Sequence, residues 1–173
     1  MWISCRLARG GGALVIGLAL ASVANLAGAE RPALRFDPQT TLELVARRMN
    51  VTLRPDVRLP RVRLESATTI ERFRDAVETQ WGSRPARFSN AFVPATNEVY
   101  LIDDPDYYAA TGRTLDDSLA HELVHYLQVY YRHANVAGEF QELEAVEIQS
   151  WFRAEHMHTK LADASGRRNS LPR

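Results

Sequence analysis

Residues Thr114–His133, with the sequence TLDDSLAHELVHYLQVYYRH, predict one long helix around which the rest of the chain must pack. The stretch contains neither Pro nor Gly, and the next helix breaker is Gly138. Thr114 is a favourable N-terminal cap, and the aspartates in the first turn suit the positive end of a helix dipole. Apolar side chains recur at helical spacing on one side: Leu115, Leu119, Leu123, Val124, Leu127 and Tyr131. We expect this stripe to face the core.

The same helix carries the pattern His-Glu-x-x-His at His121, Glu122 and His125. This spacing places both imidazoles on one helical face, about one turn apart, where they can bind one metal ion. Glu122 lies about 100° around the helix from His121. From there it can reach a metal-bound water and accept its proton as general base. The pattern predicts a hydrolytic Zn2+ site, and the alternative is a helix whose histidines lie one turn apart by coincidence.

A catalytic zinc site normally has a third protein ligand. Gln128 and Tyr131 stand where an extended form of the pattern would have Gly and His, so the third ligand must come from another part of the chain. The second helical stretch, 139–158, supplies five candidates: Glu139, Glu142, Glu144, Glu147 and Glu155.

Helical spacing favours Glu142 among these acids, because Ala145, Val146 and Gln149 share its face. Small neighbours allow the two helices to approach closely, so that the Glu142 carboxylate can reach the zinc. We therefore expect the metal ligands to be His121, His125 and Glu142. Glu144 is the alternative third ligand, although its face of the helix is more typical of a solvated acidic surface.

A helix with His121, Glu122 and His125, followed by a helix with Glu142 three residues before Ala145, resembles the gluzincin zinc metallopeptidases. The Glu-x-x-Ala element is similar to that of membrane-associated gluzincins and of small secreted HExxH proteins. The resemblance implies a compact, zincin-like α+β domain that holds Zn2+ and hydrolyses peptide or protein substrates. It also implies that Glu122 activates the attacking water.

The resemblance covers Asn97 to about Phe152 and includes a short alternating run, Glu98–Ile102, after a turn. We expect this run to be an antiparallel edge strand beside the zinc. In gluzincins such a strand pairs with an extended peptide substrate. An ordinary hairpin strand without a ligand is the alternative. Val146 departs from the family pattern, because many gluzincins have there an aspartate that supports a zinc-bound histidine.

Residues 1–29 have the composition of a secretory signal sequence. Two arginines precede an apolar run that starts at Gly10 and ends in Ala-Gly-Ala. Cleavage after Ala29 would release a secreted or periplasmic protein with no membrane segment, and an uncleaved membrane anchor is the alternative. Cys5 is the single cysteine and lies in this leader. The mature chain would therefore have neither a disulfide nor a thiolate ligand, which leaves His and carboxylate side chains for the metal.

Without the leader, the chain has 144 of its 173 residues, which is enough for one domain. The leader holds two arginines and no acid, so a balance of 21 basic against 21 acidic residues becomes 19 against 21. Scattered arginines and a net charge of −2 do not indicate a nucleic-acid partner. We expect one zincin-like domain over residues 30–162 and a flexible tail over 163–173.

Periodicity upstream predicts a helix over 40–49, a strand over 61–65 and a helix over 68–81 that buries Phe73 and Trp81. With the strand and two helices described above, the order α, β, α, β, α, α indicates a compact α+β domain.

Several other polar side chains are candidates for the site, and spacing selects none of them. The candidate oxyanion donors are Tyr107, Tyr108, Tyr130 and Tyr131. The candidate extra ligands or donors are His133, His156 and His158, and the candidate supports for the zinc ligands are Gln128 and Gln149. Two other functions fit the chain: a non-catalytic zincin-like binding module of the cell envelope, and a zinc amidohydrolase that acts on a non-peptide amide.

Overall fold

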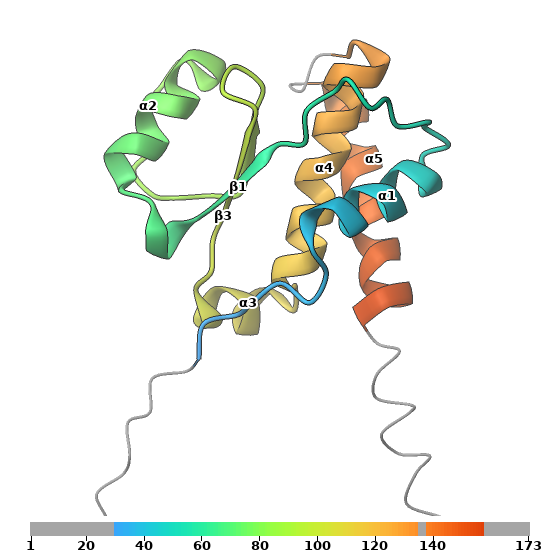
Figure 1. The fold of residues 1–173 in the computed structure, drawn as a ribbon. Coiled ribbons are helices and arrows are strands. Elements are labelled where there is room, and N and C mark those ends of the chain that lie inside the picture. Colours follow the sequence, from blue (N-terminus) through green and yellow to red (C-terminus); the bar gives the residue numbers. More distant parts are fainter. Residues whose placement is uncertain (1–29, 135–137, 158–173) are drawn as a thin grey trace, which may run out of the picture.

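The computed structural model describes residues 30–134 and 138–157, so the predicted leader (1–29) and the predicted tail (163–173) lie outside the described residues. The described elements confirm a mixed α+β arrangement (Figure 1). They are α1 (Pro38–Arg48), β1 (Arg61–Leu64), a 3-10 turn (Glu65–Ala67), α2 (Ile70–Trp81), β2 (Ala91–Val93), β3 (Glu98–Leu101), α3 (Pro105–Thr111), α4 (Leu115–Arg132), α5 (Glu139–Phe152) and a π-helical turn (Arg153–Met157).

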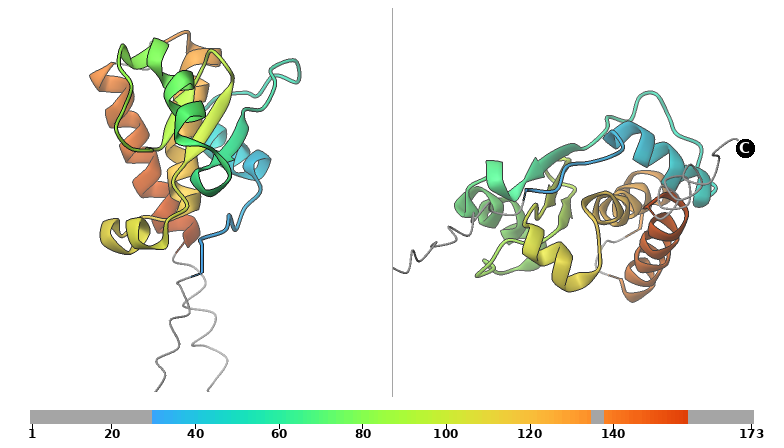
Figure 2. Two further views of the ribbon diagram at one scale, coloured as in Figure 1. Left: turned by 90° about the vertical axis from the view of Figure 1, so that its left-hand side faces the viewer. Right: turned by 90° about the horizontal axis from the view of Figure 1, so that it is seen from below.

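The small sheet separates two layers of helices, with α2 on one side and the α4–α5 pair on the other (Figure 2, right). Its strand order is β1-β3-β2, with β3 parallel to β1 and antiparallel to β2. Successive side chains of a strand point to opposite faces. Val99 and Leu101 therefore pack into the core around α4, whereas Tyr100 packs with Phe73 beneath α2.

The predicted edge strand at Glu98–Ile102 is wrong in its position, because β3 has a neighbour on each side and all four of its residues are buried. The edge strands are β1 and β2, and the sequence patterns did not predict β2. A hairpin turn joins β2 to β3 and includes Asn97 in a left-handed conformation with φ 49°. The pattern within one strand does not report how many neighbours it has, because the second neighbour, β1, comes from a distant part of the chain.

Helix α4 begins and ends as predicted, and it is the centre of the molecule. Thr114 accepts a hydrogen bond from the Asp117 amide, and the Asp117 carboxylate accepts one from the Thr114 amide, which completes a capping box. Except for His121, every residue from Leu115 to Gln128 is buried. The helix is therefore covered on more sides than its apolar stripe indicated, because α1, α5, β2 and β3 all contact it.

The remaining predicted elements are confirmed with small changes at their ends. Asp37 caps α1, whereas Thr69 and Gly82 bound α2. Trp81 is not a core residue as predicted, because it is 38% exposed at the end of α2. The short helix α3 was not predicted. Within the described residues, no helix has both the length and the apolar character needed to cross a membrane.

Candidate metal centre

Three of the predicted site residues meet between α4 and α5. His121 Nε2 lies 3.2 Å from His125 Nε2 and 3.4 Å from Glu142 Oε1, and His125 Nε2 lies 3.3 Å from Glu142 Oε2. Among the described residues, this is the one group of three or more His, Cys, Asp or Glu side chains with metal-binding geometry. The two histidines are largely buried, whereas the Glu142 side chain is 57% exposed, so the cluster opens to solvent on one side.

These separations fit a small tetrahedral ion. Ligands about 2.0–2.1 Å from a tetrahedral zinc lie about 3.3–3.4 Å from one another. Burial and the adjacent His125 lower the pKa of His121 to about 4, so the His121 ring is neutral at pH 7. Atoms with lone pairs that converge this closely favour a cation between them. The donor set of two imidazoles and one carboxylate therefore fits Zn2+.

The structure separates the two candidate third ligands. Glu142 faces both histidines, whereas the Glu144 carboxylate accepts hydrogen bonds from Gln128 and Arg132 on α4. Burial raises the pKa of Glu144, but these two hydrogen bonds outweigh it and hold that pKa below the ordinary value. The expected helical face is correct for buried Ala145 and Gln149 and wrong for Val146, which is 41% exposed. Glu142 can therefore serve as ligand, and Glu144 has a different role.

That role belongs to a chain of hydrogen bonds behind His125. Gln128 Nε2 donates to the Gln141 carbonyl (2.9 Å) and to Glu144 Oε2 (3.0 Å), so its Oε1 faces His125 Nδ1 at 2.9 Å. An amide oxygen only accepts, so Nδ1 carries the ring proton and Nε2 presents its lone pair to the site. Arg132 holds Glu144 at 2.7 Å. Gln128 thus orients a predicted ligand, as residues that hydrogen-bond a ligating histidine do in metal sites.

A matching arrangement lies behind His121. Gln149 Nε2 donates to Asp117 Oδ1 (2.8 Å), and Arg153 Nε donates to Asp117 Oδ2 (2.6 Å). The Gln149 side chain adjoins the His121 ring and raises its pKa in part. His121 Nδ1 itself is buried and makes no hydrogen bond within the described structure. Each histidine therefore has a glutamine beside it, backed by a carboxylate and an arginine.

Glu122 is buried next to the three ligands, between α4 and the edge strand β2. Burial raises the pKa of Glu122 to about 8, while a hydrogen bond from the Phe92 backbone amide lowers it in part. A carboxyl group with a pKa near neutrality can both accept and return a proton. A cation held by the ligands would favour the carboxylate form, because opposite charges attract.

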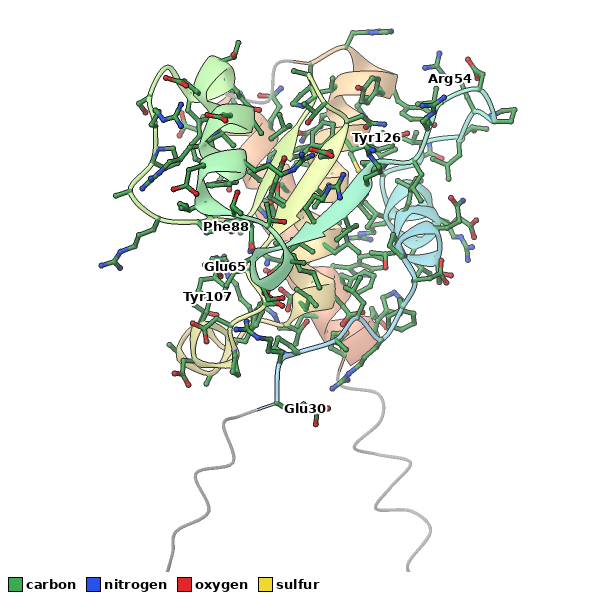
Figure 3. All side chains as sticks on the ribbon, turned by 60° about the vertical axis from the view of Figure 1, so that its left-hand side comes forward. Glu30, Arg54, Glu65, Phe88, Tyr107 and Tyr126 are labelled. Carbon is green, nitrogen blue, oxygen red and sulfur yellow. The ribbon has the colours of Figure 1, made fainter. Side chains whose placement is uncertain are left out.

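The cluster lies in a cleft of about 350 Å3. Its walls come from the end of α2, the segment that leads into β2, the helix α3, the turn before α4, and the facing sides of α4 and α5. The lining residues are Gln80, Trp81, Ser89, Asn90, Ala91, Phe92, Tyr107, Arg113, Ser118, His121, Glu122, His125, Glu142 and Gln149. Figure 3 shows Tyr107 on α3 and Phe88 on the same side of the molecule.

Of the candidate oxyanion donors and extra histidines, the structure brings only Tyr107 into the cleft among the described residues. Three tyrosine hydroxyls are engaged elsewhere: Tyr108 with the Ile102 carbonyl, Tyr130 with the Pro94 carbonyl and Tyr131 with the Arg54 amide. Tyr107 remains as a candidate oxyanion donor. His133 caps the end of α4, His156 packs among aromatic rings, and His158 lies outside the described residues. Arg113 and Ser118 line the cleft, although no sequence pattern had marked them.

Comparisons with protein-family models, with curated proteins and with solved structures give no match to this chain.

Proposed function

We propose that this protein is a zinc-dependent metallopeptidase of the gluzincin type, with His121, His125 and Glu142 as ligands and Glu122 as general base. One observation carries the proposal. The three ligand atoms converge at tetrahedral spacing in an open cleft, and a buried carboxyl group with a raised pKa lies beside them. A metal that only stabilises the fold is usually enclosed by four protein ligands, whereas a catalytic zinc keeps one position open.

The residues of the cleft divide the reaction between them. A bound zinc supplies Lewis-acid chemistry, which makes water more acidic and polarises an amide carbonyl. Glu122 accepts a proton from the attacking water, and the water oxygen bonds to the carbonyl carbon. When the carbon–nitrogen bond breaks, Glu122 returns that proton to the leaving nitrogen. Gln128 and Gln149 keep the imidazoles oriented throughout.

Strand β2 gives the cleft a place for an extended substrate. Its one neighbour in the sheet is β3, so its other edge is unpaired within the described part of the chain. Ala91 and Phe92 of β2 line the cleft, and the Phe92 amide points toward Glu122. A peptide that added to this edge would place its backbone carbonyls near the ligands. We also propose that the leader directs the protein to the periplasm or outside the cell.

The proposal is tested with protein purified without chelator. We expect one zinc per chain and cleavage of a peptide library. Glu122→Gln should keep the zinc and lower the cleavage rate at least about a hundredfold, which is the low end of what a general base contributes. Glu147→Gln is the matched control, because Glu147 lies on the exposed side of α5. Equal activity of the Glu122 variant and the parent would overturn the mechanism.

The same experiment separates the other two functions. A chain that unfolds cooperatively yet holds no stoichiometric zinc would support a binding module. A zinc-loaded chain that cleaves no peptide but hydrolyses a small non-peptide amide would support an amidohydrolase.

A further inference from the structure

One cationic side chain in the cleft has no assigned task. Arg113 is the single arginine or lysine among the described residues that line the cleft. Its guanidinium makes no ion pair or hydrogen bond with any other described residue. By contrast, Arg132 and Arg153 beside the metal centre are paired with Glu144 and Asp117. Arg113 is therefore free to bind an anion.

The backbone holds Arg113 in place from both sides. Gly112, which ends α3, has φ 63° and donates to the Tyr108 carbonyl. Thr114, which begins α4, is held by the capping box with Asp117. Arg113 is thus a single exposed residue between two fixed caps, so its backbone and the direction of its Cα–Cβ bond are set before a ligand arrives. Only the side-chain torsions remain to be ordered on binding, which limits the entropy cost.

A second polar group of the cleft also has no partner. Ser118 is 1% exposed, and its Oγ makes no hydrogen bond in the described structure. The neighbouring Tyr108 hydroxyl donates to the Ile102 carbonyl, and its oxygen adjoins the Ser118 hydroxyl, which lowers the pKa of Tyr108 in part. Buried hydroxyl groups normally have partners, so an unpartnered one that lines a cleft indicates a missing ligand. Arg113 offers charge, and Ser118 offers a hydroxyl donor.

We propose that Arg113 and Ser118 form a carboxylate-binding subsite of this cleft. This inference rests on the proposed function and names its substrate class: peptides with an acidic side chain or a C-terminal carboxylate close to the cleaved bond. Ser118 lies one turn before His121 on α4, so their Cβ atoms are about 5–6 Å apart. An extended peptide advances about 3.3–3.6 Å per residue. We therefore expect the carboxylate within two residues of the scissile amide.

The test measures binding apart from turnover. The zinc-loaded Glu122→Gln variant is mixed with alanine-rich octapeptides that carry one Glu or one Gln at successive positions, with free or amidated C-termini. Fluorescence of Trp81, which lines the cleft, reports binding. We expect the acidic peptides to bind about tenfold to a hundredfold more tightly, as for a charge-assisted hydrogen bond. If amidation of the C-terminus removes the tighter binding, the bound carboxylate is that of the chain terminus. If the tighter binding persists after amidation, the bound carboxylate is that of the Glu side chain.

Second substitutions assign the preference to the subsite. Added Arg113→Gln should abolish the preference, Arg113→Glu should shift it to peptides with Lys, and Ser118→Ala should weaken it severalfold. Arg47→Gln, at an exposed arginine of α1 outside the cleft, should leave it unchanged. Equal binding of Glu and Gln peptides, no binding of either, or a preference that survives Arg113→Gln would overturn the subsite. If the preference holds but the zinc-loaded parent cleaves no peptide, the subsite stands and the proposed function fails.

Discussion

Substitution of Gln128 by Leu tests whether the hydrogen bonds behind His125 serve the metal or only the fold. Gln128 is 1% exposed and connects His125, Glu144 and the Gln141 carbonyl. Without its oxygen, the ring proton of His125 has no acceptor at Nδ1 and can move to Nε2, the atom that faces Glu142. Zinc can then bind at Nε2 only when that proton returns to Nδ1, where it has no acceptor.

The expected loss follows from this geometry. Removal of a residue that hydrogen-bonds a metal ligand costs about tenfold to a hundredfold in metal affinity, which equals about 1.4–2.7 kcal/mol. The metal-free protein should also lose about 1–3 kcal/mol of unfolding free energy, because a buried N–H group is left without a partner. Competition with a chromophoric chelator at pH 7 measures the affinity, and urea unfolding of the metal-free protein measures the stability.

Gln128→Glu separates the two effects. Glutamate keeps the oxygen acceptor for His125 but loses both amide donors and faces the Glu144 carboxylate. We therefore expect a clear loss of stability with zinc affinity close to that of the parent. The reasoning is refuted if the Leu variant, while folded, binds zinc within about twofold of the parent, or if both variants lose affinity equally.

Two further predictions address the ligand set and the general base. Glu142→Gln should weaken zinc binding by more than the roughly hundredfold that loss of a supporting residue costs, whereas Glu144→Gln should weaken it by less than that. Metal titration of both variants measures the two affinities. A larger loss for Glu144→Gln than for Glu142→Gln would contradict the assignment of Glu142 as ligand. In the metal-free protein, the pKa of Glu122 rises from 4.5 unfolded to about 8 folded, whereas that of His121 falls from 6.5 to about 4. Between about pH 4.5 and 6.5 the effects of Glu122 and His121 on the unfolding free energy have opposite signs. Above pH 6.5 only the effect of Glu122 is left, because the folded state keeps a proton on this group that the unfolded state has lost. Unfolding free energy should therefore fall between pH 6.5 and 8, by up to about 1.4 kcal/mol per pH unit, relative to Glu122→Gln in urea titrations with chelator. Parallel curves for parent and variant would show that Glu122 does not titrate in this range.

The helices could be predicted because their signals are local. Thr114 and Asp117 mark the start of α4, and Thr69 and Gly82 mark the start and the end of α2. Each of these residues makes its capping contacts within one turn of its own helix end. The strands were harder, since β2 has three residues and no alternating pattern long enough to recognise. Its partner β3 was recognised as a strand but placed at the edge. The buried residues of β3 depend on β1, which pairs with it across the sheet.

The prediction for Trp81 failed for a related reason. Its spacing on α2 matches that of Phe73, yet it is the last residue of the helix, lines the cleft and is 38% exposed. Helical periodicity assigns a face, but only the length of the opposing element determines which residues of that face are covered.

Local sequence patterns were enough to place two histidines and a base on one helical face, because the geometry of a helix sets the spacing of its side chains. They also favoured Glu142 over Glu144 as the third ligand. The tertiary structure alone brought the Glu142 carboxylate to both imidazoles, placed Gln128 and Gln149 beside them, and gathered Arg113 and Ser118 into the same cleft. These relations join separate elements, and they arise from the packing of α4 against α5 and the sheet, which depends on the whole core and not on any short stretch of the chain.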